Sequence, residues 1–102
     1  MTFTFLYVTC SDVKEANNIS RTLLSKKLIA CANFFHVESI YQWKGKIKEG
    51  KEVVLILKTM KHKVAVVRKE IEKIHSYEIP CITEIEVKPN EKYGKWLESQ
   101  MK

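Results

Sequence analysis

Apolar residues alternate with polar ones or run together in four stretches of extended character. Residues 2–9 are rich in Phe, Tyr, Val and Thr and contain no helix breaker, which predicts a first strand covered on both faces. Residues 28–43 and the apolar block at 53–57 predict two central strands. Residues 81–87 alternate between apolar and polar side chains and predict a short fourth strand with one polar face.

The two central strands are expected to form one long hairpin. Residues 48–51 carry the turn chemistry between them, because Gly50 can adopt positive φ without strain. Such a hairpin exceeds the usual strand of about five or six residues. It would leave an unpaired edge carrying Tyr41 and Trp43, and such an edge either aggregates or pairs with another chain.

Between the first two strands, the sequence predicts a helix over residues 12–27. Ser11 or Asp12 is expected to cap its start, and Glu15 lies three residues after Asp12, as in a capping box. The apolar and small residues of this segment recur at three- and four-residue spacing, which favours a helix with one buried face.

Two further helices follow the same pattern. The second begins near Lys61 and must end before Pro80, and its apolar stripe consists of Val64, Val67, Ile71 and Ile74. The third opens with Asn90 as its N-cap and turns Tyr93, Trp96, Leu97 and Gln100 inward.

The order of elements is β-α-β-β-α-β plus a C-terminal helix, which predicts one α+β domain over residues 1–102 with the ferredoxin-like split β-α-β fold. Right-handed crossovers then require the strand order 4-1-3-2, with both internal helices on one face of the sheet. The other face would be apolar and uncovered. We therefore expect a homo-oligomer, and a trimer is the smallest ring in which three sheets enclose a common core. The alternative is a monomer with a twisted hairpin.

Composition narrows the possible partners. The chain is 45% hydrophobic and 29% charged, which argues against disorder, and its net charge of +6 raises the question of nucleic acid. The basic residues are spread along the chain, so a solvated face explains them and no nucleic-acid partner is expected. The apolar run at residues 3–10 is too short to span a bilayer, and no membrane partner is expected. Three cysteines form neither an even set nor a CxxC pair, which predicts a reducing, cytoplasmic location.

One candidate metal site follows from the topology. The fourth strand starts beside the end of the first, which should place Cys81 near Cys10, with His75 on the loop that leads in. Two thiols and an imidazole are ligands for a soft metal ion, and Glu78 could be a fourth or outer ligand. The alternative is that both cysteines are small buried residues and that His75 is a hydrogen-bonded loop histidine.

Four segments in order resemble the CutA divalent-cation tolerance family over essentially the whole chain. They are KLIACAN at 27–33, YQWKGKI at 41–47, residues 52–59, and HSYEIP at 75–80. The resemblance implies a cytoplasmic homotrimer similar in architecture to the PII signalling proteins, linked to tolerance of copper and other divalent cations. It implies copper binding and no established catalytic activity, and no metal is expected to be needed for folding.

The sequence departs from that family at two positions. Ser76 stands where the family usually has proline, which makes the bend before Tyr77 less rigid. Cys81 stands where the family usually has glutamate. If that carboxylate contributes to a metal site in relatives, the thiolate would favour softer ions such as Cu(I).

The sequence also bears on three other functions. An enzyme is not expected, because the chain has no HExxH motif, no glycine-rich phosphate loop and no Ser-His-Asp order. RNA binding would suit the fold and charge, but the third strand lacks the aromatic signature that stacks bases. A PII-like regulatory trimer would bind a small anionic ligand in clefts between subunits, lined by Lys44, Lys46 and His75.

Overall fold

The computed structural model describes residues 2–102. Its elements, in chain order, are β1 (Phe3–Cys10), α1 (Val13–Ser25), β2 (Cys31–Trp43), β3 (Lys46–Met60), a 3-10 turn (Lys61–Lys63), α2 (Val64–Ile74), β4 (Ile82–Val87) and α3 (Glu91–Gln100). None of the described helices is long and apolar enough to cross a membrane.

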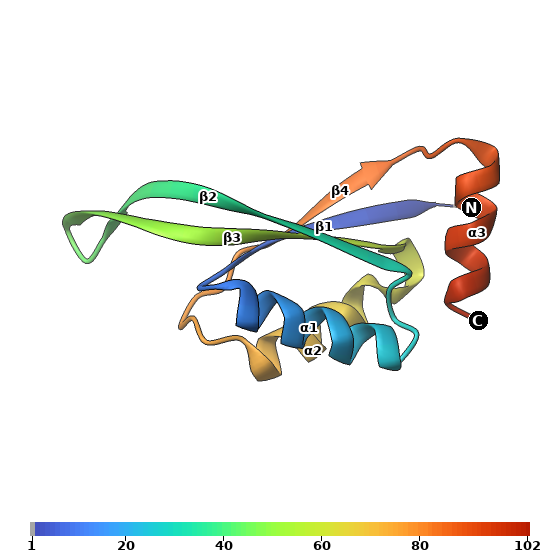
Figure 1. Ribbon diagram of the computed structural model, residues 1–102, viewed down its shortest axis with the longest axis horizontal. Helices are drawn as coiled ribbons and strands as arrows, with labels where there is room; N and C mark the ends of the chain where they lie inside the picture. Colours follow the sequence, from blue (N-terminus) through green and yellow to red (C-terminus); the bar gives the residue numbers. More distant parts are fainter. Residues whose placement is uncertain (1) are drawn as a thin grey trace.

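The four strands form one antiparallel sheet in the order β2-β3-β1-β4. This confirms the predicted order 4-1-3-2 and the ferredoxin-like fold. α1 and α2 lie side by side beneath one face of the sheet, and α3 stands at the end near the N-terminus (Figure 1). The opposite face carries no helix along most of its length (Figure 1).

The main core lies between the sheet and its two internal helices. Alternate residues of β1 point toward the helices, so that Leu6, Val8 and Cys10 are completely buried. From the helices, the fully buried side chains include Ile19 of α1 and Ile71 of α2. The periodicity of two in the strand and about 3.6 in the helices brings these apolar rows together, as the sequence pattern predicted.

The remaining residues of β1 point to the open face and are only half-buried, from Phe3 to Thr9 at every second position. The prediction that β1 is covered on both faces is therefore wrong for a single subunit. α3 covers only one end, where Leu97 and Met101 pack against Met60 and Ala30 in a small second core. The open face elsewhere has no cover within the described chain.

The β2–β3 hairpin extends well past the end of β1, as predicted (Figure 1). We call residues 37–52, which lie beyond the last β1–β3 pair, the arm. The prediction of a turn at 48–51 is wrong, because Gly50 lies within β3 and pairs with Ser39. The turn is Lys44-Gly45, with φ of 51° and 79°. Two-residue turns with positive φ at both positions match the twist of antiparallel strands.

Candidate metal centre

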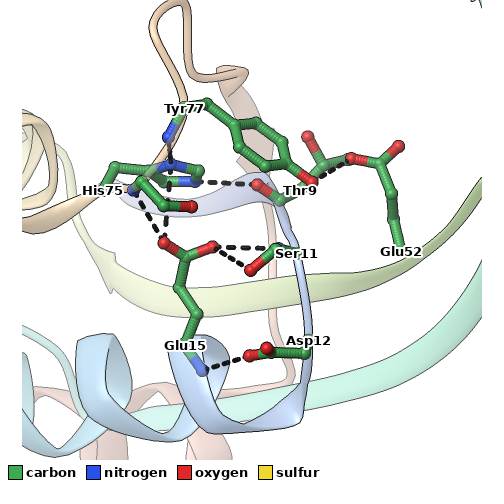
Figure 2. A network of polar contacts seen from close by, with 8 residues as sticks. Thr9, Ser11, Asp12, Glu15, Glu52, His75 and Tyr77 are labelled. Atoms are coloured by element: carbon green, nitrogen blue, oxygen red, sulfur yellow. Dashed lines mark hydrogen bonds and ion pairs between the residues drawn. The ribbon is translucent and has the colours of Figure 1, made fainter.

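Three segments meet where β1 ends: the last residue of the strand, the first turn of α1 and the loop between α2 and β4. They bring together the Cys10 thiol, the Glu15 carboxylate and the His75 imidazole, whose ligand atoms all lie within 4.8 Å of one another. Figure 2 shows Glu15 and His75 facing each other across this junction. Residues from three elements far apart in sequence thus form one polar cluster.

Glu15 is fixed by the cap of α1. The Asp12 carboxylate accepts a hydrogen bond from the Glu15 backbone N–H at 2.8 Å, which confirms Asp12 as the N-cap. One carboxylate oxygen of Glu15 accepts from the Ser11 N–H and hydroxyl at 2.9 and 3.1 Å, and the other accepts from the Ser76 N–H at 2.7 Å. Burial opposes ionisation, but these bonds and the nearby His75 hold the pKa of Glu15 below its usual value.

His75 directly follows the last turn of α2, and its side chain has no exposed surface. We assign the proton to Nε2, because that atom lies 2.8 Å from the Thr9 carbonyl oxygen, which can only accept. Nδ1 accepts from the Tyr77 N–H at 3.0 Å and lies 3.9 Å from the Glu15 carboxylate. Both ring nitrogens are therefore engaged within the chain (Figure 2).

Tyr77 connects this cluster to the arm. The centroids of the Tyr77 and His75 rings lie 4.8 Å apart in an edge-on arrangement. The Tyr77 hydroxyl donates a hydrogen bond to the Glu52 carboxylate at 2.5 Å (Figure 2). Burial, followed by the hydrogen bond and charge of Glu52, raises the pKa of Tyr77 well above its usual value. The phenol thus stays protonated and keeps the loop attached to the base of the arm.

Cys10, the third member of the cluster, has no exposed surface. Burial is the main cause that raises the pKa of Cys10 to about 12, and the charges of Glu15, Asp12 and Glu52 add to it. The thiol is therefore neutral at physiological pH, and a metal ion would have to displace its proton.

The donor set suits a metal ion in kind. A thiolate, an imidazole and a carboxylate together favour soft and borderline ions such as copper or zinc over magnesium or calcium. In their present positions Glu15 and His75 bind backbone groups and lie 3.9 Å from each other. Binding of a metal ion would therefore break at least one His75 hydrogen bond and shorten the distances among the three ligand atoms.

Of the four residues predicted as ligands, the structure brings together Cys10 and His75 but not Cys81 or Glu78. The Cys81 sulfur lies 3.5 Å from the Thr83 hydroxyl, and Thr83 pairs with Tyr7 on the open face. Cys10 points to the helix face. The prediction that Cys81 lies beside Cys10 at one site is wrong, because a one-residue step along a strand moves a side chain to the other face of the sheet.

Glu78 is exposed on the loop and is not part of the cluster. The third member is instead Glu15, which the sequence indicated only as a helix-capping residue. Its position three residues after Asp12 is typical of a capping box, and nothing else in the sequence indicated that it could be a ligand.

Comparisons with known proteins agree with the fold and the sequence motifs. A family model described as "CutA1 divalent ion tolerance protein" matches residues 4–100. The divalent-cation tolerance protein CutA of Archaeoglobus fulgidus is 43% identical over 83 residues, which cover 81% of each chain. That of Pyrococcus horikoshii is 41% identical and covers 95% of this chain and 96% of its own.

Solved structures give the same result. A structure from A. fulgidus superposes with a TM-score of 0.95 at 37% identity, covering 98% of this chain and 99% of its own. A CutA1 structure from P. horikoshii gives a TM-score of 0.93 at 39% identity, covering 97% and 98%. The similarity thus extends over nearly the whole of each chain.

The comparisons also correct one prediction. The A. fulgidus protein of known structure is described as a periplasmic divalent cation tolerance protein. This description contradicts the cytoplasmic location that was predicted from three unpaired cysteines. All three are free thiols in this fold, and free thiols alone do not assign a compartment.

Proposed function

The chain belongs to the CutA1 divalent ion tolerance family, and from that premise we propose that it is a homotrimer that binds copper or another divalent metal ion in the response to such ions. The observation that supports metal binding is the convergence of Cys10, Glu15 and His75 at the end of β1. No catalytic role is proposed, since the family is described by tolerance and not by a reaction.

In this proposal the three side chains bind the ion directly. Cys10 would supply a thiolate, His75 an imidazole nitrogen and Glu15 a carboxylate oxygen, a set that favours soft or borderline ions. Because the thiol must lose its proton, the apparent affinity should rise by about tenfold per pH unit below the thiol pKa. Tyr77 would transmit the rearrangement to the arm through Glu52.

The trimer is supported by the surface that one subunit leaves uncovered. The open face of the sheet presents half-exposed apolar side chains, among them Phe35 at 49% and Ile85 at 45% exposure. On the arm, Ile40 and Ile47 are about 70% exposed. Copies arranged in a ring would cover this face and pair the free edges of β2 and β4.

The alternative of a regulatory trimer with an anionic ligand receives less support from a single subunit. Lys44 lies in the turn at the tip of the arm and Lys46 directly follows it, whereas the His75 ring is sealed beneath the loop. The three residues expected to line an anion site do not meet within one chain.

Calorimetry with Cu(I) under anaerobic conditions tests the metal proposal. We expect the Cys10→Ser variant to bind at least about tenfold more weakly than the wild type, because the hydroxyl is a poor ligand for a soft ion. Cys81→Ser is the matched control, since Cys81 lies on the opposite face of the sheet, and it should bind as the wild type does. Equal affinity in Cys10→Ser, or a loss confined to Cys81→Ser, would contradict the proposal.

Sedimentation equilibrium tests the assembly. A species of three times the 12.0 kDa chain mass is expected at micromolar concentration. A single species of 12.0 kDa would contradict the trimer without affecting the metal proposal.

A further inference from the structure

The lone pair with which His75 would bind a metal ion is already occupied by a backbone N–H. Nε2 carries the ring proton and donates to the Thr9 carbonyl oxygen at 2.8 Å, so it has no lone pair to offer. The Nδ1 lone pair accepts the Tyr77 N–H at 3.0 Å, and the same atom lies 3.9 Å from the Glu15 carboxylate. An ion bound between His75 and Glu15 would therefore take the place of the Tyr77 amide proton.

The His75 ring cannot avoid this conflict by turning. Its side chain has no exposed surface, and rotation would break the hydrogen bonds at both ring nitrogens together. A metal-binding histidine usually donates its second ring N–H to a carbonyl or carboxylate, and the bond from Nε2 to Thr9 already has that form. The movement that opens the ligand atom must therefore come from Tyr77.

Tyr77 is held in place at both of its ends (Figure 2). Its hydroxyl donates to the Glu52 carboxylate at the base of the arm, 2.5 Å away, and its ring contacts the His75 ring edge-on. The N–H of the preceding residue, Ser76, donates to Glu15 at 2.7 Å. A carboxylate oxygen has two lone pairs, so Glu15 can keep that bond while it binds an ion, whereas Nδ1 has only one. The Tyr77 N–H is thus the contact that a metal ion must displace.

We propose that Tyr77 opposes metal binding at the cluster, because its N–H closes the Nδ1 lone pair of His75 and its hydroxyl bond to Glu52 holds it in that position. An ion binds only to the form in which Tyr77 has moved away, so the apparent affinity is reduced by the fraction of protein in that open form. The arm, which carries Glu52, thereby controls the affinity of a site on the other side of β1.

This inference rests on the proposed function, since it takes Cys10, Glu15 and His75 as the metal ligands, and it adds a regulation of that site. It requires no ligand on the open face of the sheet. It therefore holds equally when a neighbouring copy covers that face in the trimer.

The test is anaerobic calorimetry with Cu(I) at constant pH on the Tyr77→Phe variant. This substitution removes the hydroxyl but keeps the ring and changes no charge. We expect Tyr77→Phe to bind Cu(I) about tenfold more tightly than the wild type, because losing one hydrogen bond to a charged acceptor raises the open fraction. A tyrosine that only supported the site would give weaker binding when its hydroxyl is lost, so the direction of the change separates the two roles.

Two further variants locate the effect. Tyr93→Phe is the matched control, because it also loses a tyrosine hydroxyl bond, the one that Lys58 donates at 3.0 Å, but on α3. It should bind Cu(I) as the wild type does. Adding Cys10→Ser to Tyr77→Phe should abolish the gain, since the tighter binding depends on the ligands of the cluster.

Hydrogen exchange of the residue-77 amide, followed by NMR, gives a measurement that needs no bound metal. We expect this amide to exchange about tenfold faster in metal-free Tyr77→Phe than in the metal-free wild type, because the open form is more populated. In the wild type it should also exchange faster once Cu(I) is bound, because the ion has replaced its acceptor.

Equal or weaker Cu(I) binding by Tyr77→Phe, with binding by the wild type, would overturn this inference and leave the metal proposal intact. The same holds if the Tyr77 amide exchanges as slowly in the Cu(I)-bound wild type as in the metal-free protein. Binding by Tyr77→Phe alone would support both proposals. Absence of Cu(I) binding in both proteins would overturn the metal proposal, and this inference with it.

Discussion

The Cys10 thiol stabilises the folded chain as a neutral group and destabilises it as an anion. Its pKa of about 12 lies above the ordinary value of 9.0, mainly because it is buried and also because carboxylates surround it. The folded chain therefore retains the thiol proton over a pH range in which the unfolded chain releases it. The stability that depends on this proton is complete below pH 9.0 and is lost as the pH rises toward about 12.

We predict that the free energy of unfolding of the wild type falls between pH 9 and pH 11 and that Cys10→Ala removes part of this fall. At pH 7 the variant should be about 1 kcal/mol less stable, because a small buried group is lost. Urea unfolding at pH 7, 9 and 11 measures both effects. Cys31→Ala, which keeps Cys10, should retain the alkaline fall, and an identical fall in Cys10→Ala would contradict the assignment.

The contribution of Glu15 to stability has the opposite pH dependence, because it is lost in acid and not in alkali. Its folded pKa is lowered despite burial, so its contribution is present above the ordinary carboxyl pKa and is lost as the pH falls through the folded value. Glu15→Gln should cost about 1–2 kcal/mol at pH 7, because the new NH2 group replaces one of the two carboxylate oxygens and faces the N–H group of either Ser11 or Ser76.

The difference between wild type and Glu15→Gln should be smaller at pH 3 than at pH 7, because below the ordinary carboxyl pKa of 4.5 the unfolded chain takes up a proton that the folded chain binds more weakly. Thermal unfolding at the two pH values measures this change. Glu72→Gln, an exposed carboxylate on α2, is the control and should alter stability at neither pH. A difference that stays constant between pH 7 and pH 3 would show that Glu15 acts by shape and not by charge.

At the scale of the elements, the turn of the arm depends on one glycine. Gly45 has φ of +79°, and apart from its chain neighbours no atom lies within 4 Å of the place that an alanine Cβ would take, so any cost of substitution is conformational. Gly50 has equally open surroundings but does not have positive φ. These two glycines therefore separate backbone conformation from steric contact.

Gly45→Ala should destabilise the protein by about 1 kcal/mol, because L-residues avoid the left-handed region, whereas Gly50→Ala should be neutral or slightly stabilising within a strand. Guanidinium unfolding midpoints of the two variants provide the comparison. A larger loss for Gly50→Ala than for Gly45→Ala would contradict the placement of the turn.

The elements and their order could be predicted from the sequence because they depend on periodicity and on the handedness of crossovers. The position of the turn could not, because Lys44 is an unusual residue for positive φ and Gly50 offered the more conventional turn. Of the three residues of the candidate site, two were predicted from the sequence. Cys10 and His75 follow from strand topology, but excluding Cys81 requires the register to within one residue.

At the scale of the whole molecule, the sheet has one face sealed by helices and one face left open (Figure 1). Two exposed apolar residues, one on each side of the molecule, allow the roles of the two sides to be compared. Ile85 of β4 is 45% exposed on the open face, and Val66 of α2 is 49% exposed on the helix layer. In a monomer a charge at either position would remain in solvent. In the proposed trimer only Ile85 becomes buried.

Ile85→Lys should therefore weaken assembly by about 2–3 kcal/mol per subunit, because an unpaired ammonium group would be buried between copies. Val66→Lys should leave the oligomer unchanged, since lysine is a good helix former and its charge stays in water. Sedimentation of both variants over a concentration series gives the comparison. Equal dissociation of the two, or of neither, would mean that the open face is not the surface that joins the subunits.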